Sequence, residues 1–206
     1  KKFFYGKDGL IEDFLGNIES ILAPIFLKIK NHQILPEKFS QDQVSVLHFL
    51  ILLDMRNPNR KAHYEGTTKL FIEHLKNSEN PDLKTIKELE EVEKGDISFL
   101  RMIVKARDLI AICMDLEYKL LKNETQNPFV TSDNPLIKYN QFLESRKWRF
   151  GSHNGFGNIG AQWFIPVDEM YTLIFYDSNI YKVGNKKEKI VSITDTKSID
   201  NLNILQ

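Results

Sequence analysis

The stretch Asn127-Pro128-Phe129-Val130-Thr131-Ser132-Asp133-Asn134-Pro135 marks the point where the character of this 206-residue chain changes. Its apolar pair, Phe129-Val130, suits a short strand, because aromatic and β-branched side chains pack well on a pleated surface. The three small polar residues that follow favour a turn, and the closing proline disfavours a helical conformation just before it. The stretch therefore predicts a strand over Phe129–Thr131, a polar corner, and a second extended piece over Leu136–Tyr139.

Upstream of this corner, apolar residues recur at helical spacing, whereas downstream they form short runs of strand-forming residues. The predicted helices are 10–30, 40–53, 58–76, 83–94 and 97–114, with Pro24 expected to kink or split the first. The predicted strands are Tyr118–Leu121, Phe129–Thr131, Gln162–Pro166, Tyr171–Tyr176, Ile180–Val183 and Ile190–Ile193. A last helix is expected to open near Ser198.

Helices first and strands after, without alternation, predict an α+β fold. Five to six helices in the N-terminal half would pack on a small, mainly antiparallel sheet in the C-terminal half. The length fits one domain over 1–206, with 1–115 mainly helical and 116–206 mainly strands and loops. A hydrophobic content of 42%, with 14 phenylalanines, is enough for a sizeable core.

The charge balance removes the usual arguments for nucleic acid or membrane partners. The chain carries 28 basic and 28 acidic residues, so its net charge gives no support for nucleic acid or anionic lipid. No apolar stretch reaches the length of a transmembrane helix, and no signal peptide opens the sequence. The single cysteine, Cys113, excludes an intrachain disulfide and fits a reducing compartment. We therefore expect a soluble cytoplasmic protein.

Two motifs give weak functional signals. Residues 155–160, Gly-Phe-Gly-Asn-Ile-Gly, match G-x-G-x-x-G, but a dinucleotide site needs a helix after the glycines, and a strand is predicted there. A loop that is flexible or touches a partner fits better. The five histidines lack zinc-ligand spacing. A basic and aromatic cluster at 146–150 could stack on single-stranded nucleic acid, although in a neutral protein it more often anchors a loop.

Arginine and glutamate supply the candidates for a charged site. Only six of the basic residues are arginines, and Arg56 and Arg60 bracket Asn-Pro-Asn, where they could bind a phosphate or carboxylate in bidentate fashion. Glu12 and Glu19 lie two helical turns apart on one side of the first helix. In the alternative interpretation the arginines pair with nearby carboxylates and tie the helical half to the sheet. Those carboxylates would be Asp54, Glu12, Glu19 and Asp133.

At this point the residues suggest a family. The matching segments are Ile11-Glu12, Ile18-Glu19, Phe49–Arg60, Pro128–Pro135, Phe164-Ile165-Pro166, and Leu173–Asp177 with Tyr181. The chain resembles an uncharacterised, mostly bacterial family, domain of unknown function 4238, and Thr-Ser-Asp-Asn-Pro is the most specific segment. Members of the family resemble one another in an upstream His-Tyr-Val-Pro-Gln type segment and continue past Leu202-Asn203, so both ends of this chain are expected to be trimmed. The resemblance implies no established activity.

Two hypotheses follow. In the first, the domain binds or hydrolyses a phosphate-bearing substrate, a nucleotide or nucleic acid. Asp133, with Glu19 or Glu12, would hold a divalent cation or act as general base. The ligand-binding residues would be Arg56, Arg60, Thr131, Ser132 and Asn134. This hypothesis predicts that Asp133, Glu19 and Arg56 converge on one pocket. In the second, the same polar residues form a structural network, and the protein is a non-enzymatic interaction module whose partner surface is the loop from Arg146 to Gly160.

Overall fold

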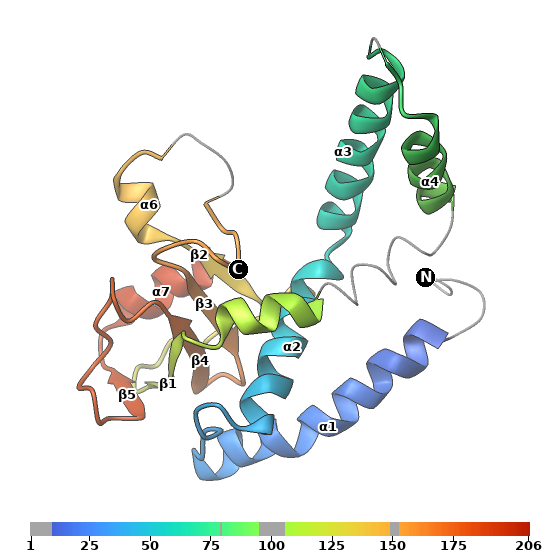
Figure 1. The fold of residues 1–206 in the computed structure, drawn as a ribbon. Helices are drawn as coiled ribbons and strands as arrows, with labels where there is room; N and C mark the ends of the chain where they lie inside the picture. Colours follow the sequence, from blue (N-terminus) through green and yellow to red (C-terminus); the bar gives the residue numbers. More distant parts are fainter. Residues whose placement is uncertain (1–9, 79, 95–105, 149–152) are drawn as a thin grey trace.

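A computed structural model describes the backbone of residues 10–78, 80–94, 106–148 and 153–206 (Figure 1). The side chains of residues 10–11, 58–65 and 92–94 lie outside that description. So do the first part of the helix predicted over 97–114 and the Arg149-Phe150 part of the basic and aromatic cluster.

The fold is α+β, as the sequence predicts. The helices before the sheet are α1 (Leu10–His32), α2 (Gln41–Met55), α3 (Pro58–Lys76), α4 (Leu83–Lys94) and a helix over residues 106–113. The strands are β1 (Glu117–Asn123), β2 (Ile137–Tyr139), β3 (Gln162–Pro166), β4 (Tyr171–Tyr176) and β5 (Ile190–Ile193). Two further helices are α6 (Gln141–Ser145) and α7 (Thr196–Ile204). Helices thus dominate the first half and strands the second.

The five strands form one mixed sheet in the order β2-β3-β4-β1-β5. β1 pairs in parallel with β5, and the other three pairings are antiparallel. Alternation of side chains along the strands gives the sheet two apolar faces. One face, with Trp163 and Phe175, shares a core with α1, α2 and the helix over 106–113. The other face, with Phe164 and Ile174, is covered by α7 through Ile199.

The helical half is built around α2, which is buried along most of its length. Ser40 caps this helix by accepting a hydrogen bond from the Gln43 backbone N–H at 3.2 Å. The Gln43 side chain reaches back to the backbone N–H of Phe39, one residue earlier than a standard capping box. α1 runs continuously through Pro24, so the predicted split does not occur. None of the described helices is long and apolar enough to cross a membrane.

His48 lies on α2 and is partly buried. It packs edge-on against Phe14, with ring centroids 6.5 Å apart. Its Nε2 atom, however, is buried without a hydrogen-bond partner among the described residues. Burial, together with the nearby Arg107 cation, lowers the pKa of His48 and favours its neutral form.

Two predicted strands are wrong. Phe129–Thr131 is extended but joins no ladder: Phe129 donates to the Glu169 carbonyl at 3.0 Å, and Pro128 before it has no N–H to give. Ile180–Val183 begins as a turn, because the N–H groups of Ile180 and Tyr181 both bond the Asp177 carbonyl. Phe129 is still buried, so its apolar character is satisfied without strand pairing.

Candidate binding site at the glycine-rich loop

A single buried amide fixes the glycine-rich loop, which we define as residues 153–160. The Asn140 side chain is 2% exposed and lies between β2 and α6. Its Nδ2 donates to the carbonyls of Ile159 at 2.9 Å and His153 at 3.2 Å. Its Oδ1 accepts from the Leu143 N–H at 2.9 Å and so caps α6. The same residue therefore holds both ends of the loop and starts the neighbouring helix.

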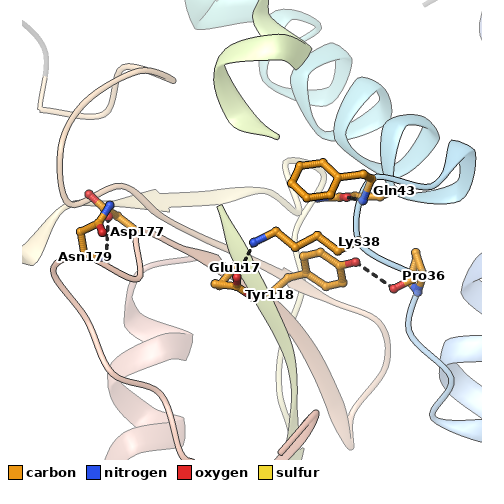
Figure 2. Close-up of polar contacts among 8 residues, drawn as sticks. Pro36, Lys38, Gln43, Glu117, Tyr118, Asp177 and Asn179 are labelled. Carbon is orange, nitrogen blue, oxygen red and sulfur yellow. Dashed lines mark hydrogen bonds and ion pairs between the residues drawn. The ribbon is translucent and has the colours of Figure 1, made fainter. Parts of the chain in front are cut away.

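Asp177 and Tyr181 hold the last glycine of the loop. The Asp177 carboxylate accepts the Gly160 N–H on one oxygen and the Asn179 N–H on the other, each at 2.9 Å; Figure 2 shows the second of these bonds. The Tyr181 hydroxyl donates to the Gly160 carbonyl at 3.1 Å and accepts from the Phe142 N–H at 2.8 Å. Burial raises the pKa of Tyr181, which keeps this hydroxyl protonated and able to donate.

Two of the glycines lie close to neighbouring side chains, and one of them, Gly160, also has a positive φ. Gly160 has φ +75°, and a Cβ there would lie 2.8 Å from the Phe142 Cβ. At Gly157 a Cβ would lie 3.1 Å from the Ile112 Cγ2 on the helix over 106–113. The loop is thus a fixed turn pressed against a helix. Strand β3 follows it directly, so the helix that a dinucleotide site needs is missing from this position.

A pocket of 260 Å³ lies between this loop, the helix over 106–113 and the end of β4. It is lined by Ile112, Asp115, Leu116, Phe156, Gly157, Asn158, Ile159, Asp177 and Asn179. Asp115 is exposed, and its side chain forms no hydrogen bond or ion pair within the described part of the chain. Apolar side chains and two carboxylates therefore line the pocket, and its described lining residues include no lysine or arginine.

Behind the pocket, an ion pair ties the helical half to the sheet. Lys138 of β2 pairs with Asp54 of α2 at 2.8 Å, and their side chains are only 7% and 13% exposed. The Lys138 ammonium also lies 4.3 Å from the ring centroid of Phe156, which packs edge-on against Trp163. This support fixes the position of Phe156 in the pocket wall.

Cys113 near this pocket is not a nucleophile. The thiol is fully buried, and burial, with the Asp115 carboxylate adding to it, raises its pKa to about 12. A thiol in that state stays protonated and unreactive at neutral pH.

The connector between α1 and α2 is fastened to the sheet at the same end. Figure 2 shows Lys38 paired with Glu117, and the Tyr118 hydroxyl donating to the Pro36 carbonyl at 2.8 Å. A second pocket, of 420 Å³, lies beside this connector, lined by residues that include Lys28, Glu37 and Asp42. Its mixed charges favour no single class of ligand. The smaller pocket has the clearer chemistry.

One protein family has a sequence profile that matches this chain. The sequence profile described as "Protein of unknown function (DUF4238)" matches residues 1–206. The chain belongs to the DUF4238 family. Neither the curated proteins nor the solved structures give a match to this chain. The DUF4238 assignment confirms the resemblance that Thr-Ser-Asp-Asn-Pro carries in the sequence.

In this DUF4238 chain the polar corner, residues 127–135, is hydrogen-bonded to α7 and to the residues after it. Asn203 accepts the Val130 N–H at 3.0 Å and donates to the Pro128 carbonyl at 2.9 Å. Gln206 accepts from the Ser132 hydroxyl at 3.1 Å and donates to the Pro135 carbonyl at 3.3 Å. The corner is therefore fixed to the C-terminal helix on the face of the sheet opposite α2.

The predicted site residues come together only in part. Arg56 and Glu19 meet at 3.2 Å, joining α2 to α1. Asp133 is exposed and takes no part in that pair; its side chain forms no hydrogen bond or ion pair within the described residues. Glu12 is also exposed, and the Arg60 side chain lies outside the described residues.

The other corner residues make local contacts. Thr131 and Ser132 are exposed, and the Ser132 hydroxyl accepts the Asn134 N–H at 3.2 Å in an ordinary turn. Among the described residues, no three His, Cys, Asp or Glu side chains gather as a metal site requires.

Sequence reasoning singled out the Arg146–Gly160 region, which supplies one wall of the pocket, but it missed the residues that fix this loop and complete the pocket. Asn140 had a usable signal, since an asparagine before Gln-Phe-Leu-Glu fits a helix cap. Asp177, before Ser-Asn at the end of a strand, had the signal of a turn. Asp115 had none, because an exposed aspartate after a helix is ordinary. Lys138 had none, because a lysine in a strand suggests an exposed position, whereas its side chain is only 7% exposed.

Proposed function

We propose that this DUF4238 protein is a non-enzymatic interaction module that binds a lysine or arginine side chain of a partner segment in the pocket beside the glycine-rich loop. The proposal is carried by one observation, the fixed 260 Å³ pocket with apolar walls and the carboxylates of Asp115 and Asp177. It develops the hypothesis that the partner surface lies in the Arg146–Gly160 region.

The chemistry of the pocket supports a cation with an apolar stem. Lysine and arginine side chains bury their methylene groups on apolar surface while the charged end seeks an anion. Ile112 and Ile159 on the pocket walls are 51% and 56% exposed, so they offer apolar surface for such a stem and for the partner around it. Asp115 offers a carboxylate, and Asp177 adds negative charge to the wall.

The pocket suits a cation better than a phosphate. A bound phosphate needs cationic or N–H donors, and the described lining residues include two carboxylates and no basic side chain. Arg56, one of the two arginines predicted to bind the anion, is paired with Glu19, and Asp133 does not join them. These contacts therefore support an interaction module more than a site that binds or hydrolyses a phosphate-bearing substrate.

We also propose that the protein works in the bacterial cytosol. The sole cysteine is buried with a raised pKa, which suits a chain that never forms an intrachain disulfide. The sequence resembles a mostly bacterial family, which supports a bacterial origin.

Titration with a cationic probe tests the binding proposal. Acetyl-arginine-amide, added to full-length protein labelled with nitrogen-15, is expected to shift the amide signals of residues 155–160 saturably. A single side chain in an open pocket should bind with Kd on the order of 1 mM. Acetyl-citrulline-amide, which keeps the shape without the charge, is expected to bind at least about tenfold more weakly, the factor that corresponds to 1.4 kcal/mol.

Two matched variants locate the response. Asp115→Asn should abolish the shifts, whereas Asp133→Asn, another exposed aspartate, should leave them unchanged. Equal shifts with citrulline, or a response that survives Asp115→Asn, would contradict the proposal.

A further inference from the structure

Helix α6 ends beside the glycine-rich loop with a positioned arginine. Arg146 lies one turn after Phe142, and its guanidinium carbon is 3.6 Å from the Phe142 ring centroid. One guanidinium N–H donates to the Phe142 carbonyl at 3.2 Å. Arg146 is nevertheless exposed, and no carboxylate of the described residues forms an ion pair with it. Its remaining N–H donors are therefore accessible to a ligand.

The backbone at the end of α6 holds this arginine in place. The Lys147 N–H bonds the Glu144 carbonyl at 2.9 Å and the Trp148 N–H bonds the Leu143 carbonyl at 3.1 Å, the paired pattern of a Schellman cap. Lys147 has φ +52°, in the left-handed region that glycine usually occupies in this cap. The cap ends α6 sharply and leaves Arg146 and Lys147 as two consecutive exposed cations.

Direct contacts connect Arg146 to the wall of the pocket. Asp177 in that wall accepts the Gly160 N–H at 2.9 Å, and a Cβ on Gly160 would lie 2.8 Å from the Phe142 Cβ. The Phe142 ring in turn contacts the Arg146 guanidinium. Burial raises the pKa of Tyr181, and among the charges nearby Asp177 raises this pKa further, while Arg146 lowers it. The negative wall and the positive helix end therefore both lie near one tyrosine hydroxyl.

We infer that the partner segment carries an acidic residue a few positions from the cation that enters the pocket, and that its carboxylate pairs with Arg146. The inference rests on the proposed function and describes the partner of the same site more closely. A guanidinium can bind a carboxylate through two parallel N–H bonds. Because Phe142 already holds the guanidinium, less side-chain freedom is lost when the carboxylate binds.

The charges around the site favour such a partner over one with charges of a single sign. A segment of cations alone would meet the like charges of Arg146 and Lys147. A polyanion would meet the carboxylates of Asp115 and Asp177. Like charges set against each other lower the affinity for the wrong partner. A segment with one cation and one carboxylate avoids both conflicts.

Two short peptides test the inference on full-length protein labelled with nitrogen-15. Acetylated and amidated Arg-Gly-Gly-Glu carries both charges, separated by about 10 Å of extended chain, and Arg-Gly-Gly-Gln keeps the cation alone. An exposed ion pair should make the first peptide bind about threefold to fivefold more tightly. This preference should decrease as salt is added, because exposed charges are screened.

Variants of Arg146 locate the preference. Arg146→Gln should bind both peptides with the Kd that the wild type has for Arg-Gly-Gly-Gln, and Arg146→Lys should retain part of the preference. Lys197→Gln, at another exposed cation on α7, is the matched control and should behave like the wild type.

Two kinds of failure are distinguishable. Equal binding of the two peptides to the wild type, or a preference that survives Arg146→Gln, would overturn the inference and leave the proposed function standing. If neither peptide shifts the amide signals of residues 155–160, the proposed function fails and the inference fails with it.

Discussion

The polar corner at 127–135 and the glycine-rich loop at 153–160 are two asparagine-containing turns with different roles. Both are held by an asparagine side chain that bonds backbone groups of the turn. Asn203 holds the corner against α7 at the surface, and Asn140 holds the loop from a position that is 2% exposed. The corner closes onto a helix, whereas the loop forms one wall of a pocket.

The difference shows that an exposed aspartate does not by itself make a binding site. Asp133 and Asp115 are both exposed aspartates without a hydrogen bond or ion pair among the described residues. Asp115 stands beside apolar walls that can bury a ligand's stem, and the contacts around Asp133 are those of a turn bound to its own chain. What surrounds a carboxylate, more than its place in a motif, determines what it can bind.

The largest effect should come from removing the buried amide. Asn140→Ala leaves the Leu143 N–H and the carbonyls of His153 and Ile159 without their partner in the protein interior, which should cost about 3 kcal/mol of unfolding free energy. Chemical denaturation measures it. Gln141→Ala, at the exposed neighbouring position, should change stability by less than about 0.5 kcal/mol. Similar losses for both variants would remove the contrast between buried and surface amides.

A glycine pair sharpens the description of the loop as a fixed turn. Gly160→Ala introduces a Cβ at φ +75° and 2.8 Å from Phe142, so we expect a loss of about 2 kcal/mol. Gly16→Ala, within α1 and with nothing within 4 Å of the added Cβ, should instead stabilise the protein by about 0.5–1 kcal/mol. Thermal melting of both variants should show opposite signs; a neutral Gly160→Ala would mean that the loop adjusts freely.

Substitutions in the contacts of the polar corner should lower the free energy of unfolding by less than those in the loop. Asn203→Ala removes two hydrogen bonds at a partly exposed position, so we expect a loss of about 1 kcal/mol, smaller than at Asn140. Asn201→Ala, on an exposed position of α7, is the matched control and should be nearly neutral. A loss at Asn203 as large as that at Asn140 would show that the corner carries as much of the fold as the loop.

The smallest effect is expected at Asp133. Asp133→Ala should change unfolding free energy by less than about 0.5 kcal/mol, because the side chain is exposed and forms no hydrogen bond or ion pair within the described residues. Calorimetry of the variant measures it. A sharp drop in melting temperature would support the buried structural network that the sequence suggested for this residue.

The sequence predicted the parts of the fold that local signals determine. Pro58 and Leu83 begin helices as expected, and β3, β4 and β5 have the predicted bounds, because strand-forming runs end there at glycine, proline, asparagine or aspartate. Phe129–Thr131 failed as a strand because its apolar residues are buried against the second core without a strand partner. Burial alone cannot reveal whether a short apolar run pairs with a neighbour.

The candidate site was less predictable, because tertiary contacts create it. The sequence singled out arginines and found the Arg56–Glu19 contact. It passed over Lys138, whose ion pair with Asp54 becomes visible only when α2 packs against the sheet. Likewise Asp115 and Asp177, separated by 62 positions in the sequence, line one pocket only after β1 and β4 pair.

Site-specific photocrosslinking in cells that make the full-length protein tests the central claim most directly. A crosslinking amino acid at Ile159, beside the pocket, is compared with one at Val130, on the corner; the two side chains are 56% and 43% exposed. Our account predicts a discrete crosslinked partner from Ile159 that disappears when Asp115→Asn is added, and no such product from Val130. A partner captured from Val130, or one captured from Ile159 regardless of Asp115, would contradict it.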